Sequence, residues 1–417
     1  MNFPEAERYL YSLGNEVSAM KLGLTNIRTL LDALGKPHEK YLKVQVAGTN
    51  GKGSVCAFLD SICREAGLRT GLYTSPHLVS ITERVKIDGV DISEAEFARI
   101  STFVRETAEK LLAAGTLEYR PTFFEQMTAI ALVAFAEAKV DLAILETGLG
   151  GRLDATTAAN AEIAAITRID LDHQEYLGND LKSIASEKVA IIHAGSQVVV
   201  CEQSRVVMNV IRERCKAVGA KARTTAEFLG QGFGLPRLGL FGEHQVENAE
   251  VAILAAYTLR EHFDISDEAV VAGLETARHP GRLEYGGRYL FDGAHNSGGA
   301  KALADYLTQF ENRPITIVFG AMRDKEIAEI VSILFPLAVK VVLTEPENTR
   351  ALSYKELLEQ IPADLSRLNI FASDHVENAL TIAETVTADD GIILVTGSLY
   401  LVGDVQKILL TQFDAPN

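Results

Sequence analysis

At 417 residues the chain is too long for one ordinary hydrophobic core, so two domains of roughly 100–300 residues are expected. Hydrophobic residues make up 47% of the chain and charged residues 23%, without low-complexity tracts, which excludes a largely disordered protein. The formal net charge of -16 argues against a nucleic-acid backbone as the main partner, so an anionic substrate would need local basic groups.

The N-terminus and the cysteines bear on cellular location. No basic segment followed by an apolar run opens the chain, and no later stretch of about 18 residues is apolar enough to span a membrane. A cytoplasmic location is therefore expected. The four cysteines, Cys56, Cys63, Cys201 and Cys215, have no C-x-x-C spacing, which favours buried reduced thiols over a disulfide or a zinc site.

Short β-branched runs alternate with amphipathic helical stretches, which predicts an α/β fold with parallel sheets. Lys43–Ala47 is expected to form a buried strand, and Ser54–Ala66 a helix that ends at Gly67. Further strands are expected at Leu142–Leu145 and Ile163–Thr167, each followed by polar residues. Open parallel sheets bind ligands at the carboxyl ends of their strands, so these polar residues are site candidates.

A Pro-Gly step within Ala277–Arg282 interrupts the helical pattern and predicts a hinge. The expected domains are therefore 1–281, a P-loop NTPase-like parallel-sheet domain, and 282–417, a smaller Rossmann-like domain. The second series of expected strands is Tyr289–Asp292, Ile315–Phe319, Lys340–Leu343 and Ile392–Thr396, with helices such as Lys301–Phe310 and Tyr354–Gln360 between them.

A glycine-rich loop joins the first expected strand to its helix, with the sequence Gly48-Thr49-Asn50-Gly51-Lys52-Gly53-Ser54. Backbone N–H groups in such a loop turn inward on phosphate oxygens, and the helix N-terminus adds a favourable dipole. Lys52 would reach the terminal phosphates and the Ser54 hydroxyl would ligate magnesium. Gly53 departs from the usual Walker spacing. The alternative, a tight turn without a ligand, leaves the lysine and the serine unexplained.

Three side chains follow or flank the expected strand ends. Glu146, before a glycine turn, suits a metal ligand, although a solvated acid is the alternative. His173 follows the next strand, but imidazole is uncommon around magnesium, so a structural histidine remains open. Lys188, by its own pattern, is an ordinary charge on an amphipathic helix.

Several motifs occur together in one order along nearly the whole chain. That order and spacing resemble the folylpolyglutamate synthase/dihydrofolate synthase branch of the Mur ligase family. The motifs are Gly48–Ser54, Tyr73–Leu78, Glu146–Asp154, Leu171–His173, Ser186–Lys188, Gly242–Gln245, His279–Glu284 and Asp292–Asn296.

The resemblance implies an ATP-driven ligase that adds L-glutamate to a folate and to dihydropteroate through an acyl phosphate. It implies two magnesium ions, the first held by Ser54 and Glu146 and the second by Glu146, His173 and a carbamylated Lys188. Lys52, His173 and Lys188 would then be the catalytic residues. Similar enzymes also imply a monomer whose partners are small molecules.

The resemblance also implies the binding residues. For ATP they are Thr49, Asn50, Gly51, Lys52, Gly53, Ser54, Asn248, Arg282, Asp292 and His295. For the acceptor they are Ser75, His77, Thr122, Phe124, Asp154 and Ala155. Without the resemblance, a surface charge at Arg282 and a simple turn at Asp292-Gly293 are open alternatives. Phe123 and Phe124 are either stacking faces or core residues.

The chain departs from the family's sequence pattern at two positions, and two alternative functions remain open. Ala190 stands where a glycine is common after the modified lysine, and Thr157 where an asparagine is usual. Cell-wall members of the family place a substrate domain before the loop, whereas forty-seven residues precede Gly48 here. A Mur-type ligase for another carboxylate is therefore one alternative. A nucleotide-gated binding module is the other, although a switch needs only the phosphate loop.

Overall fold

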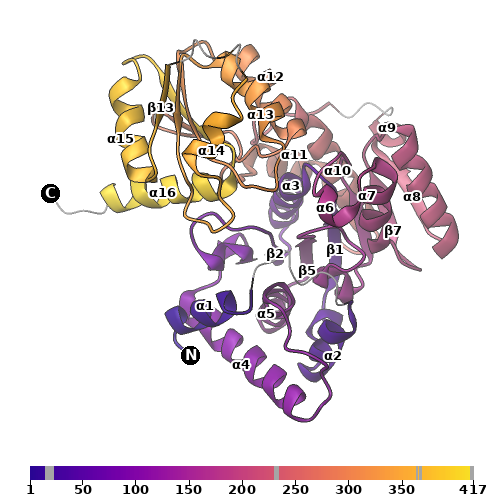
Figure 1. Ribbon diagram of the computed structural model, residues 1–417. Coiled ribbons are helices and arrows are strands. Elements are labelled where there is room, and N and C mark those ends of the chain that lie inside the picture. The colour runs from indigo at the N-terminus through magenta and orange to yellow at the C-terminus, as the bar shows by residue number, and fades with distance from the viewer. Residues whose placement is uncertain (15–22, 230–233, 363–364, 366–368, 414–417) are drawn as a thin grey trace. The chain divides into compact units, whose positions relative to one another are not determined.

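The computed structural model describes the chain except residues 15–22, 230–233, 363–364, 366–368 and 414–417. It divides into two compact units (Figure 1). The first unit comprises Met1–Gly239 and Val246–Arg278, and the second comprises Leu240–Gln245 and His279–Asn417.

The first unit is built on an eight-stranded sheet in the order β4-β3-β2-β5-β1-β6-β7-β8. The strands from β2 to β8 in that order run parallel, while β3 and β4 extend one edge as antiparallel strands. The central strands are buried on both faces, as expected of a parallel sheet covered on both sides. The strands are β1 (Leu42–Ala47), β2 (Thr70–Tyr73), β3 (Val85–Ile87), β4 (Val90–Asp91), β5 (Leu142–Glu146), β6 (Ile163–Ile166), β7 (Gln197–Val200) and β8 (Lys221–Thr224).

Helices cover the faces of this sheet (Figure 1). One core cluster joins α2, α4 and α5 to β5, and another joins α7 and α8 to β6 and β7. Helix α11 packs so closely on α3 that a Cβ on Gly273 would lie 2.4 Å from the Ile62 Cα. The helices are α1 (Phe3–Tyr11), α2 (Thr25–Ala33), α3 (Lys52–Glu65), α4 (Glu94–Ala113), α5 (Phe123–Ala138), α6 (Gln174–Leu177), α7 (Leu181–Lys188), α8 (Arg205–Val218), α9 (Thr225–Leu229), α10 (His244–Leu259) and α11 (Asp267–Thr276).

The second unit contains a six-stranded sheet in the order β13-β12-β11-β14-β10-β9. Five strands run parallel and β9 closes one edge as an antiparallel strand. The strands are β9 (Glu284–Gly286), β10 (Tyr289–Phe291), β11 (Ile315–Phe319), β12 (Lys340–Leu343), β13 (Asn369–Ala372) and β14 (Ile392–Thr396). The helices are α12 (Ser297–Phe310), α13 (Ile327–Leu334), α14 (Tyr354–Glu359), α15 (Val376–Val386) and α16 (Leu399–Phe413).

The predicted fold class is confirmed: both units are α/β with mainly parallel sheets. The four cysteines are free and buried, as expected. Among the described residues, no helix is both long enough and apolar enough to cross a membrane.

Candidate functional site

The phosphate loop leaves β1 at its carboxyl end and enters α3, and it is tied to the end of the neighbouring strand β6. The backbone amides of Thr49 and Asn50 both donate to the Arg168 carbonyl, at 2.8 and 3.3 Å. The Thr167 hydroxyl donates to the Asn50 carbonyl at 2.7 Å, and the Thr49 hydroxyl donates to the Asp170 carbonyl at 3.0 Å. The loop is therefore held in shape by contacts that do not use a ligand.

Two glycines in this loop have no room for a side chain. Gly51, at the N-cap of α3, has φ +87, and a Cβ there would lie 2.1 Å from the Asn248 side-chain oxygen. A Cβ on Gly48 would lie 1.8 Å from the Thr167 hydroxyl. The structure thus places Asn248 directly beside the phosphate loop, as part of the same cluster as Gly51 and Lys52.

Two lysines converge on one carbonyl of the loop. The Lys52 Nζ donates to the carbonyls of Gly48 and Thr49, each at 3.1 Å. The Lys188 Nζ donates to the same Gly48 carbonyl at 2.7 Å, and the Lys188 residue is 3% exposed. The amphipathic-charge alternative for Lys188 is therefore wrong, because this side chain points into the protein and reaches the phosphate loop.

Glu146 lies at the same edge of the sheet. It ends β5, pairs with Val46 of β1, and is buried. Its carboxylate accepts a hydrogen bond from the Ser75 backbone amide at 3.2 Å. Ser54 is buried in the first turn of α3. The alternative of a solvated strand-end acid is therefore excluded for Glu146.

His173 is placed less tightly. It has φ 49 at the N-cap of the short helix α6, and its ring lies 3.8 Å from the Asp172 carboxylate. Its backbone amide donates to the same carboxylate at 2.8 Å. Among the described residues, no group of three or more His, Cys, Asp or Glu side chains is arranged to hold a metal ion. Of the four residues predicted to bind metal, only Glu146 and His173 are of those types.

A second cluster of predicted residues lies around the turn after β5. The buried Asp154 carboxylate accepts hydrogen bonds from the backbone amides of Gly148 at 2.8 Å and Leu149 at 3.0 Å. Burial raises the pKa of Asp154, while these donors lower it. The Phe124 ring packs on Gly148, where an added Cβ would lie 2.6 Å from the ring. Ala155 is buried immediately after Asp154. These three predicted acceptor residues therefore belong to one region.

Phe123 and Thr122 have structural roles in α5. Phe123 is 3% exposed and belongs to the core, so the prediction of a stacking face fails for Phe123, whereas Phe124 is partly buried. The Thr122 hydroxyl caps the helix by accepting from the Glu125 amide at 3.2 Å, and the Glu125 carboxylate accepts from the Thr122 amide.

His77 lies in the segment that follows β2, and two side chains hold its ring. The Arg84 Nε lies 2.7 Å from His77 Nδ1, and the Tyr11 hydroxyl lies 3.2 Å from His77 Nε2. Because guanidinium only donates, His77 Nδ1 accepts, and the proton of the neutral ring is on Nε2. Burial, together with the Arg84 charge, lowers the pKa of His77 to about 3. His77 is therefore a neutral hydrogen-bond donor at physiological pH.

The remaining predicted ATP residues lie in the second unit. The Asp292 carboxylate accepts from the backbone amides of Leu283 at 3.0 Å and Ala294 at 2.9 Å, which confirms that it shapes a turn. Burial raises the pKa of Asp292, and the nearby Arg282 lowers it. His295 lies in the same turn, with Nδ1 2.8 Å from the Gly293 carbonyl.

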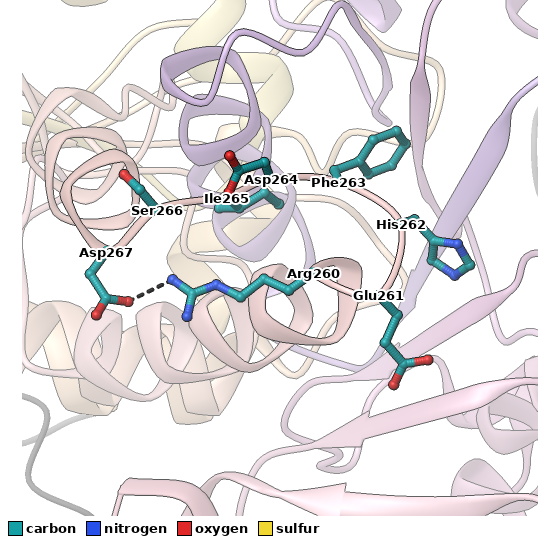
Figure 2. Close-up of a pocket in the computed structure, with 8 residues that line it drawn as sticks. All are labelled: Arg260, Glu261, His262, Phe263, Asp264, Ile265, Ser266 and Asp267. Carbon is teal, nitrogen blue, oxygen red and sulfur yellow. Dashed lines mark hydrogen bonds and ion pairs between the residues drawn. The ribbon is translucent and has the colours of Figure 1, made fainter.

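A cavity of about 580 Å³ lies in the first unit at the turn between α10 and α11 (Figure 2). It contains none of the predicted site residues. Arg260 within it points to Asp267, with 2.6 Å between the charged atoms, and Glu261 accepts from Gln197 at 2.9 Å. Gln197 is the first residue of β7, so the cavity lies at the edge of the sheet opposite the carboxyl ends where α/β sheets bind ligands.

Sequence reasoning missed the residues that brace the loops, among them Thr167, Arg168 and Asp170. Their contacts with the phosphate loop join positions more than a hundred residues apart. The polar run after β6 is the one signal that could have suggested them, because strand ends in parallel sheets meet at one edge.

Comparison with known proteins gives concordant matches. The Mur ligase middle domain matches residues 46–256, and the Mur ligase, glutamate ligase domain matches residues 281–399. The chain is 35% identical to the dihydrofolate synthase/folylpolyglutamate synthase of Bacillus subtilis, with 94% of this chain and 95% of that protein covered.

Solved structures agree with these sequence matches. The Mycobacterium tuberculosis folylpolyglutamate synthase complexed with ADP and AMPPCP is 31% identical, with a TM-score of 0.88 over 97% of this chain and 98% of that one. E. coli FolC in complex with DHPP and ADP is 28% identical, with a TM-score of 0.85 over 98% of each chain. A bifunctional folylpolyglutamate synthase/dihydrofolate synthase with Mn, AMPPNP and L-glutamate bound is 30% identical, with a TM-score of 0.84 over 98% of each chain. The chain therefore belongs to the folylpolyglutamate synthase/dihydrofolate synthase branch of the Mur ligase family.

Proposed function

We propose that this chain uses ATP to join L-glutamate to the carboxylate of a reduced folate, and also to dihydropteroate. The observation that carries the proposal is the convergence of Lys52 and Lys188 on the Gly48 carbonyl, at the strand edge that also holds Glu146. ADP, AMPPNP, DHPP and L-glutamate in the related structures support the substrate classes. The proposal includes action as a cytoplasmic monomer.

The chemistry requires activation of a carboxylate. Its oxygen attacks the γ-phosphorus of ATP, ADP leaves, and the resulting acyl phosphate has a good leaving group. The amine of glutamate then attacks the acyl carbon, phosphate departs, and an amide forms with release of a proton. Negative charge builds up on the transferred phosphoryl group. Lys52 would offset that charge, because its Nζ lies at the phosphate loop, within hydrogen-bond distance of the Gly48 and Thr49 carbonyls.

Ser54 and Glu146 offer the oxygen donors that a divalent cation prefers. Ser54 and Glu146 would hold a first ion, and Glu146, His173 and a modified Lys188 a second. Bound there, the ions would neutralise phosphate charge and polarise the reacting oxygens. The buried Glu146 carboxylate accepts one amide hydrogen bond from Ser75, and Mn in a relative supports a divalent metal.

Lys188 as an ammonium group cannot ligate a cation. Its Nζ and that of Lys52 both contact Gly48, so the two charges lie within about 6 Å and repel each other by about 1 to 3 kcal/mol. A carbamate on Lys188 would relieve this repulsion and provide an anionic ligand. It forms when the neutral amine attacks carbon dioxide, making a C–N bond and releasing a proton.

The proposal assigns ATP binding to both domains, 1–281 and 282–417. Gly51 and Gly53 would bind phosphates through their backbone amides, and Asn248 lies beside the same loop. The amides of Thr49 and Asn50 already donate to the Arg168 carbonyl, so these two residues are assigned to the ATP site through their place in the loop. Arg282, Asp292 and His295 would bind the nucleotide from the second domain. Acceptor binding is assigned to Ser75, His77, Thr122, Phe124, Asp154 and Ala155.

One experiment tests the function. The protein is incubated with ATP, magnesium and labelled glutamate, with dihydropteroate or tetrahydrofolate offered separately, and the products are identified by mass. Glutamylation of both acceptors is expected. Glutamylation of neither, with transfer to a nucleotide-linked muropeptide, would establish a different Mur-type ligase. ATP turnover that neither glutamate nor acceptor changes would establish a nucleotide-gated module.

A further inference from the structure

A contact between the turn after β5 and the end of α7 lies next to Lys188. The Arg152 backbone amide donates to the Glu187 carbonyl at 2.9 Å, and the Arg152 Nε donates to the Glu187 carboxylate, also at 2.9 Å. The Arg152 side chain is 56% exposed, and exposed ion pairs contribute about 0 to 1 kcal/mol to stability. This two-point contact therefore adds little to the stability of the fold, and its main effect is to fix the turn after β5 against the end of α7.

Gly151 brings the backbone of the same turn against the end of α7. A Cβ there would lie 2.7 Å from the Lys188 carbonyl oxygen and 2.8 Å from that of Glu187. Atoms this close leave the last turn of α7 little room to shift unless the turn after β5 moves with it. Lys188 is the last residue of that helix, and its Nζ reaches Gly48.

The other side of the turn leads to the acceptor region. The Thr157 hydroxyl donates to the Gly151 carbonyl at 2.7 Å. The Asp154 carboxylate closes the turn by accepting from the amides of Gly148 and Leu149. A continuous series of contacts therefore runs from Asp154 through Arg152 to Lys188.

We propose that Arg152 and Glu187 are positioning residues that hold Lys188 at the phosphate loop and couple acceptor binding to nucleotide binding. The inference rests on the proposed function, because Asp154 is taken as part of the acceptor site and Gly48 as part of the phosphate site. Movement of the turn when the acceptor binds would shift the end of α7 and hence the Lys188 Nζ. By thermodynamic linkage, nucleotide binding must then change the affinity for the acceptor by the same factor as acceptor binding changes the affinity for the nucleotide.

The test compares R152M and E187M with R99M. Arg99 is a matched control because it is 54% exposed and forms ion pairs with Glu96 and Glu137 on α4 and α5. For each protein, the dissociation constant of AMPPNP with magnesium is measured with and without dihydropteroate, together with kcat and Tm. In wild type, dihydropteroate is expected to tighten AMPPNP binding about fivefold or more.

In R152M and E187M, the ratio of the AMPPNP dissociation constants measured without and with dihydropteroate is expected to fall close to one. The kcat is expected to fall about tenfold, and Tm to stay within about 2 °C of wild type. E187Q keeps an oxygen acceptor for Arg152, so it is expected to stay within about threefold of wild type. R99M is expected to match wild type in all three measurements.

The proposal would be overturned if R152M kept the wild-type kcat and the wild-type effect of dihydropteroate on AMPPNP binding. It would also be overturned if dihydropteroate had no such effect in the wild type, or if E187Q were as impaired as E187M. Failure of the proposed function looks different: wild type then forms no glutamylated product from either acceptor.

Discussion

The Lys188 Nζ donates a 2.7 Å hydrogen bond to the Gly48 carbonyl, although the two residues are 140 positions apart in the sequence. This contact joins the end of α7 to the first residue of the phosphate loop, and Lys52 donates to the same oxygen. A buried lysine in such a place is costly unless it is paired, which favours a role at the phosphate site over a purely structural one.

Replacement of Lys188 is the most direct test of that role. K188M keeps an apolar stem of similar length but removes the group at Gly48, so kcat is expected to fall roughly 100-fold. K182M is the matched control, because Lys182 lies on the same helix with an exposed side chain. Wild-type kcat in K188M at limiting magnesium would remove Lys188 from the catalytic set.

Gly51 gives a prediction that separates backbone strain from loss of space. Both Gly51 and Gly67 have positive φ, at +87 and +79, so alanine at either site is strained by about 1–2 kcal/mol. Only at Gly51 does the new Cβ meet a neighbour, the Asn248 oxygen at 2.1 Å. G51A is therefore expected to weaken AMPPNP binding at least about tenfold, and G67A to leave it unchanged, as titration calorimetry would show.

A double variant completes this test. G51A with N248A removes the clashing oxygen, so part of the nucleotide affinity is expected to return unless Asn248 itself contacts ATP. Equal losses of affinity in G51A and G67A would mean that strain alone, rather than the contact with Asn248, is responsible.

Local patterns predicted seven of the strands that the structure describes, because these strands are short, buried and mostly apolar, but they did not predict others such as β2, β7 and β13. β11 and β12 match their expected ranges, and β5 is one residue longer. The phosphate loop was also readable, since the chemistry of phosphate binding requires its glycines and lysine in a short segment. Helix α3 begins two residues earlier than expected, at Lys52, because the loop glycine at 51 already serves as N-cap.

Contacts that join distant segments were not predictable in the same way. Nothing in the pattern of Ser186-Glu187-Lys188 distinguishes a surface lysine from one that reaches Gly48, since the difference depends on how α7 packs. The bond from Arg152 to Glu187 was invisible for the same reason. The segment 240–245 also joins the second unit, although it precedes the predicted hinge by more than thirty residues.

The neighbouring residues Phe123 and Phe124 should separate stability from acceptor binding. F123L leaves a cavity at a core position that is 3% exposed, so it is expected to lower the free energy of unfolding by about 1 kcal/mol or more. F124L alters the partly buried ring beside Gly148, so it is expected to raise KM for dihydropteroate about tenfold with little change in Tm. Denaturant unfolding and steady-state kinetics on both variants make the comparison. An unchanged KM in F124L would remove Phe124 from the acceptor site.

His77 predicts a pH dependence of stability whose sign can be worked out. Its pKa is about 3 in the folded protein, below the ordinary value of 6.5, because burial and Arg84 disfavour the charged ring. The unfolded chain therefore binds the extra proton first as pH falls. Stability from the neutral ring is complete above pH 6.5 and is lost between pH 6.5 and 3, at about 1.4 kcal/mol per pH unit.

H77Q isolates this contribution, because glutamine does not titrate yet offers Arg84 an oxygen acceptor and Tyr11 an amide donor. Urea unfolding of both proteins at pH 7.5, 6.5 and 5.5 is expected to show wild type losing about 1 kcal/mol relative to H77Q between the last two values. Contributions from all other groups are common to the two proteins and cancel from this difference. A difference that stays constant with pH would show that His77 binds its proton equally in the folded and unfolded chains, and His77 could then no longer be assigned as a ring kept neutral by folding.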